Sequence, residues 1–325
     1  MENLKILTQV LRSTDRILIS SHINPDGDSI GSLIGLGLAL ESLGKDVLLV
    51  NSDETPSVFQ FLEGAERILR PEQVIVLPNT AILVDCTDLN RVGSDFAERL
   101  KNIPTLINID HHLSNSRFGH YNLVDEGAAA TAEIIAKLLD PLGVNINKAI
   151  ATALYTGVVM DTGSFRYSNT TSDTLRLAAY LLEQKVDLDQ VSDELFETQP
   201  LVMLKLMGEA LQNLMISTDG SIAWVEVSQE MLRRIGAKDE HCDGLINHPR
   251  SVVGVEIGIL FREISGGQIK VGFRSKSFAD VNQLAAQFGG GGHRRAAGCV
   301  VSGSMRTVVQ RVLLAADEIL HCNEN

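Results

Sequence analysis

Aspartate and histidine recur in four short stretches of the sequence, each at the end of an apolar run. The stretches are residues 21–32 (SHINPDGDSIGS), 84–88 (VDCTD), 108–112 (NIDHH) and 160–165 (MDTGSF). The candidate side chains in them are His22, Asp26, Asp28, Asp85, Asp110, His111, His112 and Asp161. One such cluster alone is ordinary turn chemistry. Four clusters at successive element ends indicate a shared chemical site.

Divalent metal ions are the chemistry that this combination favours. Carboxylates packed together repel one another, and without a counter-charge some of them are forced to hold protons. Mixed carboxylate and imidazole ligation without thiolate suits Mn²⁺, with Mg²⁺, Co²⁺ or Zn²⁺ as substitutes. One ion needs about four to six ligands, so this many candidates predict two ions that share a bridging carboxylate. Two ions about 4 Å apart are a device for hydrolysing phosphate esters.

The elements that must position these residues form an α/β domain over residues 1–190. Short strand-like runs (RILISSH, DVLLVNS, TAILVDCTD, TLINIDHH) alternate with helix-like runs. This order predicts a mostly parallel sheet flanked by helices, and the carboxyl ends of its strands line one crevice. Pro25 and Gly27 bend the first strand-to-helix turn, and the helix expected from about Ser29 favours anionic ligands at its N-terminus.

The rest of the chain predicts a second, smaller domain. Residues 191–215 have a helical pattern broken by Pro200 and are interpreted as a helical linker. From residue 216 to residue 325, strand-like runs follow one another at short spacing, with two helix-like runs among them. This pattern of closely spaced strands with a few helices predicts an α/β domain with a mixed sheet.

Composition and charge restrict the partners. The 325 residues contain 28 Lys and Arg against 41 Asp and Glu, a net charge of −13. A protein this acidic lacks the broad basic face that holds long duplex nucleic acid. The four cysteines show no C-x-x-C spacing, the N-terminus has no signal-peptide pattern, and the run LIGLGLAL is too short to span a bilayer. We therefore expect a cytoplasmic protein without a membrane partner.

The four motifs resemble those of the DHH phosphoesterase superfamily, whose namesake triplet matches Asp110-His111-His112. Residues 289–298 (GGGGHRRAAG) resemble the signature of the DHH-associated substrate-binding domain. Length and final motif are most similar to bacterial nanoRNase/pAp-phosphatase proteins. The resemblance implies hydrolysis of short oligonucleotides and adenosine 3′,5′-bisphosphate, by a hydroxide generated between two metal ions in a cleft between the domains.

The resemblance also implies a role for each motif residue. One metal ion would bind His22, Asp26 and Asp85, and the second would bind Asp28, Asp85, His111 and Asp161, with Asp85 bridging. His112 would be the catalytic or phosphate-contacting imidazole. Asp110 would orient the histidines.

Substrate-binding candidates come from the second domain. Consecutive glycines let backbone N–H groups approach an anion, and His293 follows the run. Arg250 and Arg274 are candidates for a bidentate grip on a terminal phosphate. The substrate-binding set is Gly290, Gly291, Gly292, His293, Arg274 and Arg250. Such a clamp would favour molecules a few nucleotides long.

Other functions share parts of this pattern. A phosphodiesterase for cyclic dinucleotides or their linear products would use the same metal site. A manganese pyrophosphatase shares the first motifs but differs in the C-terminal basic pattern, and a long-strand 5′ exonuclease would have a larger chain. A nucleotide sensor without turnover requires a broken metal site, and none of the expected ligands is missing. The sequence leaves the oligomeric state open, and the apolar helices are compatible with a homodimer.

Overall fold

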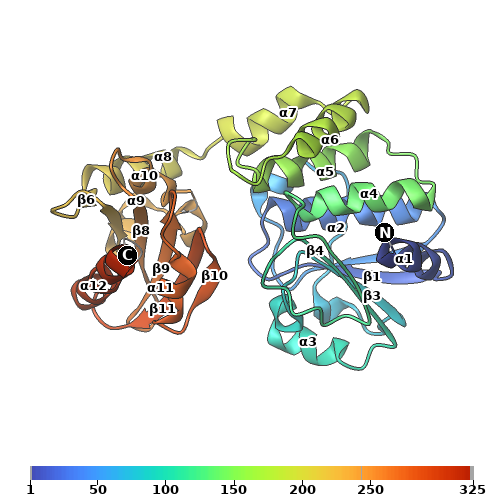
Figure 1. The fold of residues 1–325 in the computed structure, drawn as a ribbon, viewed down its shortest axis with the longest axis horizontal. Helices are drawn as coiled ribbons and strands as arrows, with labels where there is room; N and C mark the ends of the chain where they lie inside the picture. The colour runs from blue at the N-terminus through green and yellow to red at the C-terminus, as the bar shows by residue number, and fades with distance from the viewer. Residues whose placement is uncertain (1, 243, 323–325) are drawn as a thin grey trace. The chain divides into compact units, whose positions relative to one another are not determined.

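The protein folds into two compact units, Met1–Thr198 and Gln199–Asn325. The computed structural model describes residues 2–242 and 244–322. Each unit has its own sheet and its own hydrophobic core (Figure 1).

The first unit is built on a five-stranded parallel sheet with the order β2-β1-β3-β4-β5. Its strands are β1 (Arg16–Ser20), β2 (Asp46–Val50), β3 (Thr80–Val84), β4 (Thr105–Asp110) and β5 (Tyr121–Val124). The central strand β3 is buried along its whole length, as the continuous apolar run TAILV requires when both faces of a sheet are covered. The predicted parallel α/β architecture is confirmed.

Helices cover both faces of this sheet (Figure 1). Alternate strand residues divide between two cores: Ile17 and Ile82 face one, and Leu18 and Leu83 face the other. The first face carries α1 (Glu2–Arg12), α2 (Gly27–Ser42), α4 (Thr131–Leu142), α5 (Lys148–Asp161) and α6 (Ser172–Glu183). The second face carries α3 (Ser94–Leu100) and the 3₁₀ turn η4 (Leu89–Val92). Further short turns are η1 (Ser57–Phe59), η2 (Ala65–Arg67), η3 (Pro71–Gln73), α7 (Leu188–Ser192) and the π-turn η5 (Asp193–Glu197).

Two helices of the first face approach very closely. A Cβ atom at Gly31 of α2 would lie 2.4 Å from the carbonyl oxygen of Ala153 in α5. Only glycine permits this backbone contact. The close approach brings the two ends that carry candidate ligands, the start of α2 and the end of α5, into the same layer.

The second unit contains a six-stranded mixed sheet with the order β10-β11-β9-β8-β7-β6, in which only β7 and β8 pair in parallel. Its strands are β6 (Met215–Ile216), β7 (Ile222–Val227), β8 (Ile257–Ile264), β9 (Gln268–Ser275), β10 (Gly291–His293) and β11 (Ala296–Ser302). The mixed sheet agrees with the predicted fold class.

The helices of the second unit pack on both faces of its sheet. Its helices are α8 (Leu201–Gln212), α9 (Gln229–Ile235), η6 (Asp239–Cys242), α10 (Asn247–Ser251), α11 (Val281–Ala286) and α12 (Met305–Cys322). One core joins α11 and α12 to Phe261 and Phe273, and a smaller one joins α8 and α9 to Leu260. Helix α8, from the segment expected as a linker, belongs to this smaller core through Leu206. Among the residues that the structure describes, no helix has the length and apolar character needed to cross a bilayer.

Candidate metal centre

The order of the first sheet creates one switch point, because β2 and β3 lie on opposite sides of β1. Ligands of open parallel sheets bind outside the carboxyl ends of the strands at such a point. His22 lies just beyond β1 and Asp85 immediately follows β3, so the two flank it. His22 Nε2 lies 3.4 Å from Asp85 Oδ2. The sheet topology therefore brings the first two motifs together.

The structure gathers all eight candidate side chains of the four motifs into three overlapping groups. In each group the possible ligand atoms lie within 4.8 Å of one another. The groups are His22 with Asp26 and Asp85; Asp28 with His111 and Asp161; and Asp85 with Asp110, His111 and His112. Asp85 and His111 each belong to two groups, so the three form one continuous centre.

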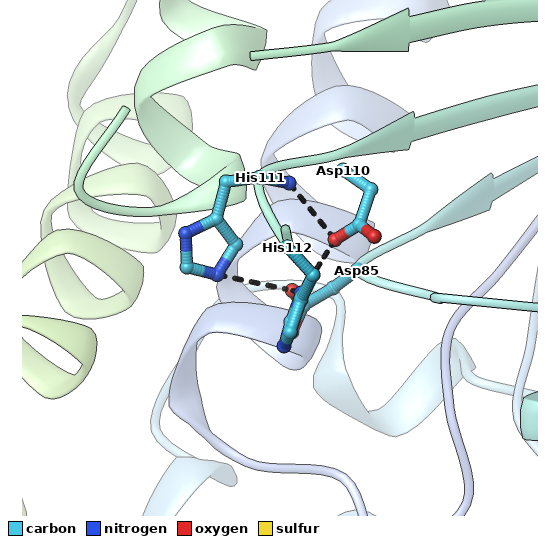
Figure 2. Close-up of side chains that lie close together, drawn as sticks. All are labelled: Asp85, Asp110, His111 and His112. Atoms are coloured by element: carbon cyan, nitrogen blue, oxygen red, sulfur yellow. Dashed lines mark hydrogen bonds and ion pairs between the residues drawn. The ribbon is translucent and has the colours of Figure 1, made fainter. Parts of the chain in front are cut away.

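The Asp-His-His triplet ends β4, and Asp110 is its buried anchor (Figure 2). One oxygen of this carboxylate accepts the backbone N–H of His111 at 2.9 Å and the Nδ1–H of His112 at 2.6 Å. The His111 ring extends the other way, with Nε2 3.7 Å from Asp85 and 3.4 Å from Asp161. Asp110 thus orients His112, while His111 reaches the carboxylates of two other motifs.

The tautomers of two imidazoles are fixed by carbonyl groups. Nδ1 of His22 donates to the Ile23 carbonyl at 2.9 Å, and Nδ1 of His111 donates to the Ala128 carbonyl at 3.4 Å. A carbonyl oxygen can only accept, so the proton of each neutral ring lies on Nδ1. In the neutral ring that a metal ion requires, each Nε2 lone pair would face the carboxylates.

The N-terminus of α4 holds the carboxylates in place, and sequence reasoning missed it. Asp28 accepts the backbone N–H groups of Thr131 at 2.6 Å and Ala132 at 3.0 Å. The Thr131 hydroxyl donates to Asp85 Oδ1 at 3.0 Å. The free N–H groups and the positive dipole end of a helix favour a carboxylate. The only signal in the sequence was one threonine after three alanines.

Asn115 is a second residue that sequence reasoning missed. Its amide nitrogen lies 2.6 Å from Asp110 Oδ2 and 2.8 Å from Asn108 Oδ1. Asn169 plays a similar part at the other end of the centre, since it donates to the carbonyls of Asp161 and Ala129. Each follows its motif closely in sequence, which was the available signal.

Electrostatics show that the centre is short of positive charge. Burial and the neighbouring Asp85 raise the pKa of Asp28 to about 7. Burial, Asp28 and Asp85 hold the pKa of Asp161 well above its ordinary value. Burial lowers the pKa of His22, but hydrogen bonds to Asp26 and Asp85 outweigh it and raise that pKa to about 11.

The remaining shifts have the same origin. Burial raises the pKa of Asp85, but His22 and the imidazoles of His111 and His112 outweigh it and lower that pKa. Burial also opposes the charged forms of His111 and His112, yet the surrounding carboxylates raise the pKa of both. Protons thus compensate carboxylates that repel one another. The donor set, oxygen and imidazole nitrogen around shared carboxylates, fits divalent cations that would replace those protons.

The structure places Arg250 and Arg274 on one face of the second sheet. Gly258 of β8 lies opposite Arg274 of β9 in the register, and a Cβ atom at Gly258 would lie 2.5 Å from the Arg250 backbone nitrogen. Side chains directly opposite each other across a strand pair share a face. Helix α10, which carries Arg250, therefore covers the face to which Arg274 belongs.

The glycine run forms the edge strand β10 against β11 instead of an open loop. A Cβ atom at Gly290 would lie 2.2 Å from the Gly298 carbonyl oxygen, and one at Gly292 would lie 2.5 Å from that of Ala296. The backbone of β11 thus leaves no room for a side chain at Gly290 or Gly292, which is one reason for glycine at these positions. Gly291 pairs with Gly298 in the register. The side chain of His293 lies outside the described part of the structure.

Comparisons with known proteins agree with this architecture. Residues 16–158 match the DHH family, N-terminal domain, and residues 222–321 match the DHHA1 domain. A bifunctional oligoribonuclease and PAP phosphatase NrnA from Thermus thermophilus is 34% identical over 98% of this chain and 95% of its own length. The protein of that name from Bacillus subtilis is 30% identical over 90% and 93%.

A solved structure of an exopolyphosphatase-related protein from Bacteroides fragilis shares the whole fold. Its TM-score is 0.94 at 27% identity, and the alignment covers 100% of this chain and 98% of the other. The four motifs, their convergence at the sheet switch point and these matches lead to one conclusion: the chain belongs to the DHH family of phosphoesterases and carries a C-terminal DHHA1 domain.

Proposed function

We propose that the protein is a metal-dependent hydrolase that degrades short oligonucleotides and dephosphorylates adenosine 3′,5′-bisphosphate in the cytoplasm. The observation that carries the proposal is the single centre formed around Asp85 by side chains from four distant motifs. The names of the similar proteins from Thermus thermophilus and Bacillus subtilis support the substrate class. The net charge of −13 supports short substrates over long duplexes.

In this proposal the centre binds two divalent ions, with Mn²⁺ as the preferred metal. His22, Asp26 and Asp85 would hold one ion, and Asp28, His111 and Asp161 would hold the other. Asp85, which also lies beside His111, would be shared between them. When bound, such a pair lowers the pKa of water and neutralises charge on a phosphoryl group. The protein supplies the rest: Asp110 accepts a hydrogen bond from the Nδ1–H of His112 and favours the protonated ring, whose Nε2–H then donates to the phosphoryl oxygen on which charge develops.

The DHHA1 domain, taken as residues 216–325 after a linker at 191–215, is proposed to bind the substrate. In this proposal Arg250 and Arg274 contact a substrate phosphate, and Gly291 and Gly292 offer backbone N–H groups to it. Gly290 shapes the run, since its own N–H donates to the Ala285 carbonyl at 2.9 Å. Each charged contact of this kind adds affinity without needing a broad basic surface.

A substrate panel with Mn²⁺ tests the proposal. It contains RNAs from two to about twenty nucleotides, adenosine 3′,5′-bisphosphate, cyclic di-AMP, its linear product and pyrophosphate. We expect the fastest hydrolysis for the shortest RNAs and the bisphosphate. We expect Asp85→Asn to lose activity by at least about 100-fold. Even the mutation of a residue that only hydrogen-bonds to a metal ligand lowers activity or metal affinity about 10–100-fold. Asp88→Asn, three residues along the same loop, is the matched control.

Three results would contradict the proposal in distinct ways. Equal rates on two-nucleotide and twenty-nucleotide RNAs would refute the length selection. A marked preference for cyclic di-AMP or its linear product would support the cyclic-dinucleotide alternative. Turnover that is equal in Asp85→Asn and wild type, with and without chelator, would refute the metal centre.

A further inference from the structure

Glu256 is a buried carboxylate in the second unit, immediately before β8, and only 6% of it is exposed. Its two oxygens accept five contacts from one loop. Ser277 donates its backbone N–H to both oxygens at 2.9 and 3.0 Å and its hydroxyl at 2.6 Å. The backbone N–H groups of Phe278 and Ala279 donate at 2.7 and 2.8 Å. These bonds occupy the acceptor sites that a carboxylate offers, so Glu256 acts as an anchor for the loop.

The anchored loop, residues 276–280, joins β9 to α11 and is bonded to the basic turn of the glycine motif. Its flanking residues, Ser275 and Val281, donate backbone N–H groups to the carbonyls of Arg295 and Arg294 at 3.0 and 2.9 Å. The Lys276 N–H donates to the Glu256 carbonyl at 2.9 Å. The loop is therefore fixed to Glu256 on one side and to the turn on the other.

This arrangement connects Glu256 to the residues proposed to bind phosphate. Arg274 is the residue before Ser275, and it pairs with Gly258, two residues after Glu256, and with Ala296 of β11. Helix α11, which the loop leads into, packs against β10 and β11. We call the set of Arg250, Arg274 and the turn Arg294–Arg295 the basic corner. One carboxylate holds the loop that begins two residues after Arg274 and whose flanking residues bond the Arg294–Arg295 turn. Gly258, two residues after that carboxylate, lies against the backbone of Arg250.

The charge of Glu256 is stabilised where it lies. Burial raises the pKa of Glu256, but the Ser277 hydroxyl and the backbone N–H groups outweigh burial and lower that pKa. Ser277 and Phe278 are themselves exposed. Their N–H groups can turn to water if the carboxylate charge is removed, so its loss frees this end of the loop. Ala279 belongs to the apolar core of the unit and keeps the other end attached.

We propose that Glu256 is a positioning residue, which sets the geometry of the basic corner and thereby the affinity for a nucleotide phosphate. The inference rests on the proposed function, because it assumes that the basic corner binds the substrate. It predicts an effect on binding and not on the chemical step, since Glu256 belongs to a different unit from the metal centre.

The test compares full-length wild type, Glu256→Gln, Glu256→Asp and Ser277→Ala. Glu263→Gln is the matched control, because Glu263 lies at the other end of β8 and also accepts a backbone N–H, from Gln229 at 2.9 Å. Four quantities are measured below the unfolding temperature: KM and kcat on a two-nucleotide RNA, Kd of adenosine 3′,5′-bisphosphate without metal, and the rate of amide exchange over residues 277–279. We expect Glu256→Gln to raise KM and Kd about 10-fold with kcat within about twofold, the pattern of lost uniform binding.

The other variants should change KM by smaller amounts than Glu256→Gln does. Ser277→Ala keeps all backbone donors and should raise KM less than Glu256→Gln does. Glu256→Asp keeps the charge and should recover part of the affinity. Faster amide exchange at Phe278 and Ala279 should accompany the rise in KM. Glu263→Gln should match wild type.

Several outcomes would overturn the inference. Faster exchange over residues 277–279 with unchanged KM and Kd would show that the anchor has a structural role alone. A fall in kcat at constant KM would place the effect on the chemical step and contradict the inference. Equal effects of Glu263→Gln and Glu256→Gln would show that the effect is not specific to Glu256. In those cases wild type still hydrolyses RNA, so the proposed function stands. If wild type neither hydrolyses RNA nor binds the bisphosphate, both the proposed function and the role of Glu256 are wrong.

Discussion

Asp85 concentrates the interactions of the candidate metal centre in one residue. Its backbone has a φ of 58°, a left-handed conformation that is uncommon for residues other than glycine and costs about 1–3 kcal/mol. Its N–H donates to the Ile109 carbonyl at 2.9 Å, which fixes this conformation. The carboxylate lies 3.4 Å from His22 and 3.7 Å from His111. The unusual backbone turns the side chain into the switch point, where ligands from both sides reach it.

Thr131→Val tests whether the hydroxyl that donates to Asp85 sets metal affinity. Valine keeps the shape of threonine and the backbone N–H that binds Asp28, and it removes only the hydrogen bond to Asp85. We expect Mn²⁺ affinity to fall about 10-fold, because partners of metal-binding carboxylates contribute 10–100-fold. Calorimetric titration with Mn²⁺ measures it.

The control for this change is Thr152→Val, whose hydroxyl bonds only the Lys148 carbonyl of its own helix. Equal Mn²⁺ affinities of the two variants would show that the Thr131 hydroxyl has no part in organising the centre.

Three helices meet at the carboxylate of Asp28. Asp28 lies in the first turn of α2, the N-terminus of α4 donates two N–H groups to it, and Gly157 of α5 faces it. The glycine leaves space that a side chain would fill. The metal centre therefore depends on how closely helices pack as well as on the identity of its ligands.

Gly157→Ala should disturb the centre although it replaces none of the candidate ligands. The added Cβ would lie 2.9 Å from Asp28 Oδ1 and 2.8 Å from the Cβ of Ala132, closer than real contacts allow. We expect a loss of about 1–3 kcal/mol in the free energy of unfolding, as in overpacked cores, and weaker Mn²⁺ binding. Denaturant unfolding and Mn²⁺ titration measure the two effects.

Gly208→Ala is the matched control, since Gly208 is an exposed residue of α8 with no atom within 4 Å of its ideal Cβ position. This variant should gain about 0.5–1 kcal/mol in the free energy of unfolding, because alanine reduces the conformational entropy of the unfolded chain. Its Mn²⁺ binding should be unchanged. Gly157→Ala protein that binds Mn²⁺ as wild type does would contradict the packing argument.

The Glu256 anchor also predicts how stability depends on pH. The pKa of Glu256 lies below its ordinary value of 4.5, so the folded state binds its proton less readily than the unfolded state does. Its contribution is complete above about pH 4.5 and is lost as pH falls through the lowered folded pKa. We expect wild type to exceed Glu256→Gln by about 1–3 kcal/mol in free energy of unfolding at pH 7, and by less near pH 3.

Urea unfolding of both proteins at several pH values checks this dependence. A difference that stays constant from pH 7 to pH 3 would mean that the charge of Glu256 contributes nothing.

At the scale of the whole molecule, the two units carry different candidate sites. The first unit holds the candidate metal centre entirely within residues 22–161, and the second unit holds the basic corner. The family matches divide the same way, with the DHH domain over residues 16–158 and the DHHA1 domain over residues 222–321. Each unit buries enough apolar surface to form its own core. Ligands of one unit should therefore stabilise that unit first.

Metal addition should raise the stability of the first unit alone. A ligand at 100 times its Kd stabilises the state that binds it by about 2.7 kcal/mol. We expect Mn²⁺ to slow amide exchange in the strands β1, β3 and β4, and EDTA to reverse this, while exchange in β8 and β9 stays the same. Hydrogen exchange with mass spectrometry measures both sets of strands. Equal protection of the two units would contradict a metal centre confined to the first.

Much of the fold followed from local patterns. Apolar runs such as TAILV predicted buried parallel strands, and the closely spaced strands after residue 216 predicted the mixed sheet. Both predictions are confirmed, because burial on both faces demands apolar residues whatever the neighbouring strands are. The domain boundaries, the ligand roles and the substrate-binding residues stay predictions.

The sequence by itself determined which residues are able to carry the chemistry, since carboxylates and imidazoles at strand ends are local features. Only the tertiary structure decided what holds them. Thr131, Asn115 and Glu256 act on residues that lie 46, 5 and 21 positions away. Hydrogen bonds of this kind depend on three-dimensional proximity, and a single polar residue in the sequence carries no mark of the partner that folding will bring to it.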